Sequence, residues 1–389
     1  MKLLYIASSS GWGGGSVALF NLINGLKNRG HEILVLFPNG KNKRFCDELD
    51  QIDIPYSFAN YGLTIFPKTR NPLKRLIRLL RIIRNRYLTQ RVVLELINSF
   101  NPDIVHTNVG PLDIALSPCL KTRIPHVWHL REYQDLDFGM TSIPSKKYFK
   151  NRIHKRGNYN IAITNGVFSY WELDPLKDIV INDGVFSEDH QTIYRSKEKL
   201  ILFVGRVEEA KGVLDVIEPF SRIHELYPDY KFIIAGKYNK EDHYYQKCMK
   251  LIAEFGLSDN ISFLGEITNV YEWMSIAKAL VVPSRFEGFG FITVEAMLNN
   301  CFVVGRDTAG TKEQFDICLE SSGEECAYRF TDTDGLFRGM RYAIENSTDN
   351  QCRLSQIVVR KRYTLENHCK KVEAYYERIL SEELSKKRC

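Results

Sequence analysis

Short, uninterrupted apolar runs recur along the whole chain, with helical stretches between them, and this alternation restricts the possible folds more than any other feature. A strand with one solvated face alternates apolar and polar residues, whereas a strand covered on both faces is apolar throughout. The sequence therefore predicts parallel sheets covered by helices on both faces. The expected strands are Leu3–Ala7, Ile33–Phe37, Ile104–His106, His126–Trp128, Ile161–Thr164 and Ile179–Ile181, followed by Leu200–Val204, Lys231–Ala235, Ile261–Leu264, Leu280–Val282 and Phe302–Val304.

The length of the chain predicts two such domains. A chain of 389 residues normally exceeds what one hydrophobic core can organise. The polar stretch at residues 187–192 divides the expected strands into two groups, and we interpret it as the linker. The predicted fold is α/β, with two doubly wound, Rossmann-like domains over residues 1–187 and 195–364 that face each other across a cleft. Ligand sites are then expected at the carboxyl ends of the strands.

The composition excludes several classes of function. The nine cysteines form no Cys-x-x-Cys pair and no histidines cluster at metal-binding spacing, which is typical of reduced thiols in a cytosolic protein without zinc. The run Leu3–Ala7 is too short for the core of a signal peptide. No apolar run approaches the roughly 20 residues that cross a bilayer. We therefore expect a cytoplasmic protein that is not integral to a membrane.

A strand, a glycine turn and a helix start meet at residues 283–295, and this segment carries the most specific chemical signal. Gly288 and Gly290 lie between Glu287 and Glu295, after the apolar run that ends at Val282. The start of the following helix offers free backbone amides and a positive dipole end, which suit a phosphate. The two carboxylates can accept hydrogen bonds from hydroxyls on either side of it. The segment predicts a site for a nucleoside diphosphate that carries a sugar.

Two further turns can contribute to that site. Arg206 and Lys211 follow the strand that ends at Val204, where a bidentate guanidinium and a point charge would neutralise a diphosphate leaving group. In isolation these would be ordinary surface cations, and the neighbouring glutamates favour the functional interpretation. The segment Ala309-Gly310-Thr311, with Glu313, follows the expected strand Phe302–Val304 and could hold a phosphate or a sugar hydroxyl.

In the first half, the loop Gly11–Ser16 carries Gly13, Gly14 and Gly15 after the first strand. A dinucleotide fingerprint would also need a carboxylate about 20 residues further on, but the second strand ends at Leu36-Phe37-Pro38-Asn39. We interpret the loop as a glycine edge that reaches toward ligand.

His129 follows an apolar strand directly, as candidate ligand-facing residues do in such folds. A lone histidine is more often a packing or capping residue than a catalytic one, and the position at a strand's carboxyl end makes the two interpretations of His129 about equal. His106, at the end of another strand, is interpreted as structural. The pairs Asp135-x-Asp137 and Asp332-x-Asp334 resemble metal-binding pairs. Such pairs arise easily by chance and neither follows a strand in a helpful context, so solvated loops are the preferred interpretation.

A helix over Leu73–Leu88 is predicted to place its apolar residues on one side and Lys74, Arg75, Arg78 and Arg81 on the other, with no acidic residue between positions 54 and 94. A solvated helix face normally mixes charges of both signs. Residues 68–91 therefore favour contact with an anionic membrane surface over packing on the protein itself. Nucleic acid is not expected, because no recognised binding fold accompanies the charge.

These motifs together resemble glycosyltransferase family 4, whose members are retaining enzymes of the GT-B architecture, and the resemblance extends over nearly the whole chain. The matching motifs are Gly14-Gly15, Arg29-Gly30-His31-Glu32, Asn182-Asp183-Gly184-Val185, Phe203-Val204-Gly205-Arg206 with Lys211-Gly212, Glu287 to Glu295 with Ala296-Met297, and Gly310 with Glu313.

The resemblance implies a role for each matching residue. Arg206 and Lys211 would bind the donor diphosphate, and Glu295 the nucleotide ribose. Glu287 would lie at the donor sugar, within a donor-binding turn of Gly288, Phe289 and Gly290, and His129 would contact the sugar near the reacting carbon, which makes Glu287 and His129 the catalytic candidates. The helix 365–389 would cross back onto an acceptor-binding first domain, with Val372, Tyr375, Tyr376 and Ile379 on one face.

The implied activity is transfer of a hexose-type sugar from a UDP- or GDP-sugar, with retention, without metal or other cofactor, to a glycan or lipid-linked acceptor. The place would be the inner face of the cell membrane, in bacterial surface polysaccharide synthesis, including lipopolysaccharide. Two alternatives stay open: a nucleotide-sugar epimerase of the same fold, and a non-catalytic sugar-nucleotide-binding subunit. Asn300 and Phe302 replace the family's usual Gly and Pro, which affects the expected donor preference.

Overall fold

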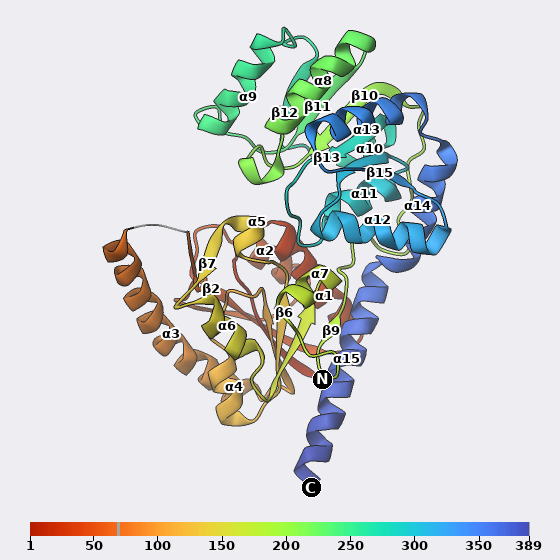
Figure 1. The fold of residues 1–389 in the computed structure, drawn as a ribbon. Helices are drawn as coiled ribbons and strands as arrows, with labels where there is room; N and C mark the ends of the chain where they lie inside the picture. The colour runs from red at the N-terminus through yellow and green to blue at the C-terminus, as the bar shows by residue number, and fades with distance from the viewer. Residues whose placement is uncertain (68–70, 389) are drawn as a thin grey trace. The chain divides into compact units, whose positions relative to one another are not determined.

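The structure is a computed structural model that describes residues 1–67 and 71–388, and the chain divides into two compact units (Figure 1). Unit 1 comprises Met1–Ser187 and Leu365–Cys389, and unit 2 comprises Glu188–Thr364. Each unit is built around one parallel sheet, so the predicted fold class of two doubly wound α/β domains is confirmed.

The sheet of unit 1 has seven parallel strands in the order β3-β2-β1-β5-β6-β8-β9. Strands β5, β6 and β8 are buried along their whole length, as expected for a sheet covered on both faces, although they carry polar as well as apolar residues. A separate antiparallel pair joins β4 to β7. The strand bounds are β1 Lys2–Ile6, β2 Glu32–Pro38, β3 Tyr56–Ala59, β4 Ile65–Pro67, β5 Ile104–Asn108, β6 His126–Leu130, β7 Met140–Ser142, β8 Asn158–Ala162 and β9 Ile179–Val180.

The helices of unit 1 cover this sheet. Side chains of α1 and of the last helix, α15, meet the sheet in one buried cluster, to which Val372, Tyr375, Tyr376 and Ile379 all belong. A second cluster joins the carboxyl-terminal half of α3, through Val93 and Ile97, to the sheet. The helix bounds are α1 Gly14–Asn28, α2 Arg44–Asp50, α3 Pro72–Phe100, α4 Leu116–Thr122, α5 Asp135–Phe138, α6 Lys146–Ile153, α7 Asn165–Tyr170 and α15 Leu365–Arg388.

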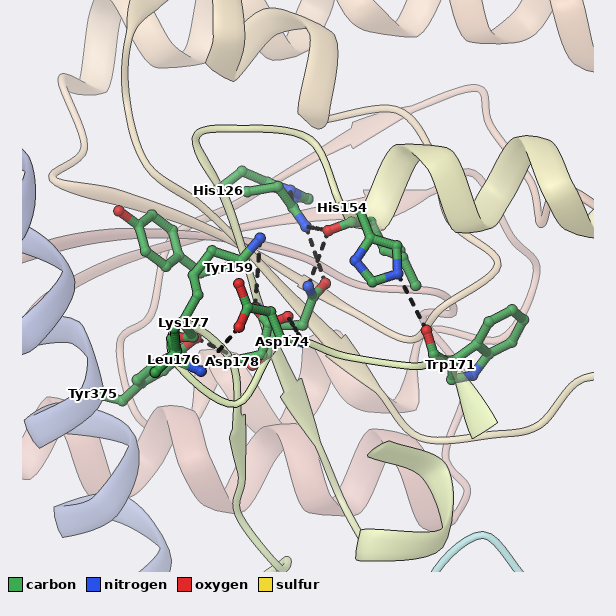
Figure 2. Close-up of polar contacts among 12 residues, drawn as sticks. His126, His154, Tyr159, Trp171, Asp174, Leu176, Lys177, Asp178 and Tyr375 are labelled. Carbon is green, nitrogen blue, oxygen red and sulfur yellow. Dashed lines mark hydrogen bonds and ion pairs between the residues drawn. The ribbon is translucent and has the colours of Figure 1, made fainter. Parts of the chain in front are cut away.

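A polar network connects β8 and the segment before β9 to α15 (Figure 2). It supplies the hydrogen bonds that allow β8 to carry two buried asparagines. The Asn158 side chain bonds to the His126 ring at 2.6 Å, and the backbone amide of Asn160 donates to the Asp178 carboxylate at 2.9 Å. Tyr375 of α15 donates to the carbonyls of Asn160 and Lys177. Buried polar groups are stable only when they are hydrogen bonded, and this network satisfies those at the sheet edge.

The sheet of unit 2 has six parallel strands in the order β12-β11-β10-β13-β14-β15, which is the Rossmann order 3-2-1-4-5-6. The strand bounds are β10 Glu198–Val204, β11 Lys231–Ala235, β12 Ile261–Gly265, β13 Ala277–Val282, β14 Phe302–Arg306 and β15 Ala327–Phe330. The helix bounds are η1 Glu209–Lys211, α8 Leu214–Leu226, α9 His243–Glu254, α10 Val270–Ile276, α11 Phe291–Leu298, α12 Ala309–Ser322, α13 Thr333–Glu345 and α14 Asp349–Arg362. In such a sheet the strand order reverses between β10 and β13, which is where ligands bind.

Every strand expected from an apolar run is present, although β8 begins three residues earlier than expected. The structure adds β3 and β15 at the sheet edges, where the residues are only partly buried and the apolar signal is weak. Within residues 1–67 and 71–388, none of the helices combines the length and the hydropathy that crossing a bilayer requires. The eight cysteines of that part of the chain are free and buried.

Candidate functional site

The turn between β13 and α11 presents unpaired backbone amides at the point where the strand order of unit 2 reverses. Gly290 adopts a left-handed conformation with φ of 84° and begins α11, which most other residues would do only with strain. The amides of Phe291 and Ile292, in the first turn of α11, have no hydrogen-bond partner in the described part of the chain. Free amides at a helix start bind anions, so this turn is a candidate phosphate site.

Glu287 and Lys211 form a direct ion pair beside this turn. The Lys211 Nζ lies 2.6 Å from the Glu287 Oε1, and both side chains keep some exposure to solvent. Lys211 follows β10 and Glu287 follows β13, and these two strands are neighbours in the sheet. The pair places one positive and one negative group at the carboxyl ends of these strands, where a ligand with a phosphate and hydroxyl groups can bind to both.

Arg206 also lies at the carboxyl end of β10, but its side chain is more exposed than those of Lys211 and Glu287. It follows β10 directly, its side chain is 61% exposed, and its guanidinium lies 2.9 Å from the Glu208 carboxylate. An exposed guanidinium can exchange such a surface ion pair for a phosphate at little cost, because the pair itself contributes about 1 kcal/mol or less.

Glu295 projects from the second turn of α11 and differs from Glu287 in its electrostatics. Enclosure by the protein raises the pKa of its carboxyl to about 7, and hydrogen bonding to Tyr271 of α10 offsets only part of that shift. A carboxyl group with a pKa near neutrality changes its protonation state in the range where enzymes work, which is typical of functional sites.

The start of α12 holds the glycine turn in place. The Gly310 amide donates to the Glu287 carbonyl at 2.9 Å, and a β-carbon on Gly310 would lie 2.4 Å from the Phe289 carbonyl oxygen. The Gln314 amide group donates to the carbonyls of Phe289 and Gly290. Sequence reasoning identified Gly310 but missed Gln314, whose only signal was its position one helical turn later on the same face.

Asn300 shows how the chain ends α11 without the expected glycine. Its φ is 57°, in the left-handed region that asparagine tolerates better than most residues, as predicted from the sequence. Phe302, the second departure, is buried in the core of unit 2.

His129 lies in unit 1, fully buried in β6. Neither ring nitrogen has a hydrogen-bond partner among the residues that the structure describes, and the rings of His106 and His368 lie 5.4 and 6.3 Å away. Burial, the nearby Arg131 and the two other histidines hold the pKa of His129 well below its usual value, so the ring is neutral. His106, interpreted as structural, bonds to the Tyr376 hydroxyl at 2.6 Å.

The residues that follow His129 form a buried polar group that sequence reasoning did not use. Arg131 pairs with Asp183 and donates to the Asn108 side chain at 2.7 Å. Glu132 accepts a hydrogen bond from the Gly110 amide at 2.7 Å, and burial raises its pKa to about 8. The signal that could have identified these residues is the pair of charged residues directly after an apolar strand.

Backbone strain accompanies this polar group. Val109 has a φ of 105° and Gln134 a φ of 71°, both outside the conformations that these side chains favour. Such strain collects at functional sites, so the carboxyl ends of β5 and β6 are a second candidate site.

The glycines of the first loop have no structural requirement to be glycine. Gly13, Gly14 and Gly15 lie at the start of α1, and a β-carbon at any of them would meet no atom within 4 Å. None of the three has a positive φ. The fold itself does not require glycine at these positions. A ligand that approaches the backbone closely would explain why glycines occur here.

The amino-terminal half of α3 is exposed on its apolar as well as its cationic side. Leu73, Leu76, Leu80 and Ile83 are 64, 51, 58 and 54% exposed, and Lys74, Arg78 and Arg81 are exposed as well. The side chain of Arg75 and residues 68–70 lie outside the described part of the chain. The alternative of an ordinary helix whose apolar side packs on its own domain is therefore wrong for this half of α3.

The two Asp-x-Asp pairs lie at helix starts, at α5 and α13, so the interpretation as solvated loops is wrong, and both pairs have partners within the protein. Asp135 pairs with Lys146 and accepts from the Tyr170 hydroxyl, and Asp137 accepts from the Tyr133 amide at 2.8 Å. Asp332 caps α13, and Asp334 pairs with Arg222 at 2.6 Å. In the described ranges, no group of three or more His, Cys, Asp or Glu side chains is placed to hold a metal ion.

The predicted site residues thus fall into two sets. Unit 2 brings Lys211, Glu287, Glu295 and the glycine turn 288–290 together at the carboxyl ends of the central strands β10 and β13, where Arg206 also lies. His129, the glycines 13–15 and the cations of α3 belong to unit 1.

Two family models match the chain in adjacent segments. Residues 12–173 match the model described as Glycosyltransferase Family 4, and residues 186–321 match the model described as Glycosyl transferases group 1. The first segment lies in unit 1 and the second almost entirely in unit 2.

Curated relatives share low but extended similarity. The capsular polysaccharide biosynthesis glycosyltransferase CapH of Staphylococcus aureus is 23% identical over 347 residues, which cover 83% of this chain and 86% of CapH. The lipopolysaccharide core biosynthesis mannosyltransferase LpsB of Rhizobium meliloti is 27% identical over 190 residues, 47% of this chain and 52% of LpsB. A Campylobacter jejuni enzyme named as an N-acetylgalactosaminyltransferase acting on a diphospho-undecaprenol-linked saccharide is 28% identical over 235 residues, 52% of this chain and 58% of that enzyme.

Solved structures share the whole fold. Anabaena HepE in complex with UDP has a TM-score of 0.77 at 18% identity and covers 96% of this chain and 99% of its own. The lipopolysaccharide outer core galactosyltransferase WaaB has a TM-score of 0.69 at 17% identity, with 96% and 99% covered. At this level of identity the similarity establishes the fold, which is GT-B.

Proposed function

The chain belongs to glycosyltransferase family 4, and from this premise we propose that it transfers a hexose-type sugar from a UDP- or GDP-sugar to a lipid-linked glycan, with retention of the anomeric configuration and without a metal ion. Its relatives in capsule and lipopolysaccharide synthesis support a glycosyltransferase of bacterial surface polysaccharide synthesis. UDP complexes among the structures of the same fold support a nucleotide-sugar donor.

The observation that carries this proposal is the Lys211–Glu287 pair beside the unpaired amides of Phe291 and Ile292. The amides and Lys211, with Arg206, would hold the diphosphate, whose charge increases as the glycosidic bond breaks. Glu287 would accept hydroxyl hydrogens of the donor sugar, and Glu295 those of the nucleotide ribose. Catalysis by positioning and by stabilising charge on the leaving group fits these groups.

In the proposed reaction the acceptor hydroxyl approaches the anomeric carbon from the side that the diphosphate leaves. The bond between the anomeric carbon and the diphosphate oxygen breaks, and a bond to the acceptor oxygen forms on the same face. The acceptor proton passes to the departing diphosphate oxygen. His129, neutral in its buried position, would contribute a hydrogen bond to the donor sugar rather than a charge.

The acceptor is proposed to be a saccharide on a membrane lipid, because one relative is named for a diphospho-undecaprenol-linked substrate. Exposed leucines and cations on one half of α3 support binding to the inner face of an anionic membrane. Each cation near such a surface contributes roughly 1 kcal/mol.

The test is a thermal-shift screen of UDP- and GDP-sugars, followed by assay of the stabilising donor with a lipid-linked acceptor in the presence of EDTA. A ligand stabilises in proportion to the logarithm of its concentration over its dissociation constant. We expect one donor to stabilise the protein, a product whose new bond keeps the donor's anomeric configuration in proton NMR, and no loss of rate with EDTA.

Each part of the proposal has its own contrary result. Epimerised nucleotide sugar without transfer would establish the epimerase, and donor binding without any turnover would establish a binding subunit. Loss of transfer in EDTA that added Mg²⁺ restores would contradict metal independence. Co-sedimentation with anionic vesicles that persists after Arg75, Arg78 and Arg81 are all replaced by Gln would contradict the membrane contact.

A further inference from the structure

A pocket of about 520 Å³ opens between α3 and the segment that leads into β4, entirely within unit 1. It is not part of the candidate donor site, which lies in unit 2. Its lining divides into an apolar part, which includes Phe66 and Ile77, and a cationic part. The cations are Lys74, Arg78, Arg81 and Arg86.

The positive charge of this pocket is largely uncompensated. Arg86 lies 3.1 Å from the Asp113 carboxylate, which also pairs with Arg152 at 2.7 Å. Among the described residues, no carboxylate lies within 4.0 Å of the charged groups of Lys74, Arg78 or Arg81. Like charges that converge on one hollow repel one another, and a bound anion removes that repulsion.

The apolar residues beside the cations indicate that the ligand has an apolar part next to its anionic group. The Arg78 guanidinium lies 5.0 Å from the centre of the Phe66 ring, so one wall of the pocket joins a cation to an aromatic surface. Ile77 lines the pocket, and the next apolar residues of α3, Leu76 and Leu80, are outside the lining and more than half exposed. An anion that continues into an apolar chain would use both surfaces.

We propose that this pocket binds the diphosphate of a polyprenyl diphosphate carrier, with the first units of the chain along Phe66 and Ile77. This rests on the proposed function and specifies where its lipid-linked acceptor is held. Arg78 and Arg81 grip phosphate oxygens bidentately, and Lys74 acts as a point charge. A phospholipid phosphodiester carries one negative charge, whereas a diphosphate carries at least two, which matches a pocket with three unpaired cations better.

The test uses farnesyl diphosphate as a soluble probe of the full-length protein, titrated by calorimetry with UDP present in excess to occupy the donor site. The double variant Arg78→Gln/Arg81→Gln is expected to bind the probe at least about tenfold more weakly, because it loses charge-assisted hydrogen bonds to the diphosphate. Arg84→Gln is the matched control, because Arg84 is an exposed arginine of the same helix that does not line the pocket. It is expected to bind as the unaltered protein does.

Three results would overturn the proposal. The first is no binding of farnesyl diphosphate, and the second is an equal loss in the Arg84→Gln control. In the third, inorganic pyrophosphate binds as tightly and with the same dependence on Arg78 and Arg81, so the ligand is a free diphosphate and not a lipid carrier. Binding of UDP by the double variant, measured without the probe, is expected to be unchanged, because Arg78 and Arg81 belong to unit 1 and the candidate donor site to unit 2. An equal loss of UDP binding would show that the substitutions do not act on the pocket alone and would also overturn the proposal.

Discussion

The Lys211 Nζ and the Glu287 Oε1 lie 2.6 Å apart, although 76 residues separate them along the chain. Their strands, β10 and β13, are neighbours at the point where the order of the sheet reverses. The pair therefore concentrates opposite charges where a diphosphate and a sugar would meet.

Replacing Lys211 by Ala removes the only cation paired with Glu287 among the described residues. We expect the rate of transfer to fall about a hundredfold or more, because a preorganised charge that stabilises the leaving group is lost. Steady-state kinetics with a saturating acceptor measure this. Lys250→Ala is the control, since Lys250 forms an exposed ion pair with Glu254 on α9, and an equal loss in that variant would show that the effect is not local.

The pKa of Glu295, raised to about 7, predicts how donor binding depends on pH. The ionised carboxylate accepts hydrogen bonds from the two ribose hydroxyls through both of its oxygens, whereas the protonated group turns one oxygen into a donor. Affinity for a nucleotide sugar should therefore rise as the pH increases through about 7. A UDP-sugar is the suitable probe, because its diphosphate has no second ionisation in this range. Glu295→Gln should weaken binding and abolish the rise, and a rise that persists in this variant would assign the titration to another group.

Glycines at two turns should respond differently to a single added methyl group. Gly310→Ala places a β-carbon 2.4 Å from the Phe289 carbonyl oxygen, so it should lower the melting temperature and weaken donor binding. Gly14→Ala meets no protein atom within 4 Å and should leave the melting temperature unchanged or slightly higher, because alanine favours a helix start more than glycine.

The same Gly14→Ala variant should still transfer sugar more slowly if ligand approaches the backbone there. Differential scanning calorimetry and the transfer assay measure the two properties separately. Full activity of Gly14→Ala would remove the glycine loop from the site, and an unchanged melting temperature of Gly310→Ala would contradict the close contact with Phe289.

Burial of Glu132 predicts that unit 1 loses stability as the pH rises from about 4.5 to about 8. Its pKa is raised from 4.5 to about 8 in the folded protein, so between these values the folded state binds one more proton than the unfolded state. Its contribution is complete below 4.5 and is lost as the pH rises through about 8. The expected slope is about 1.4 kcal/mol per pH unit. Urea unfolding at several pH values should show a flatter profile for Glu132→Gln, and identical profiles would contradict the shift.

The sequence alone determined the succession of strands and helices, the two-domain α/β fold and the glycine turn between Glu287 and Glu295. These features depend on local chemistry, because an apolar run buries itself wherever it occurs and glycine permits a sharp turn in any context. The edge strands β3 and β15 were missed for the same reason, since residues that are only partly buried need not be apolar.

Only the tertiary structure decided which groups meet and how they ionise. The pairing of Lys211 with Glu287, the burial of His129 without a hydrogen-bond partner and the raised pKa values of Glu132 and Glu295 all arise from residues distant in sequence. The sequence left open whether the apolar side of α3 packs on the protein, and the structure exposes it in the amino-terminal half. Burial and proximity are properties of the packed chain, and no local pattern of residues specifies them.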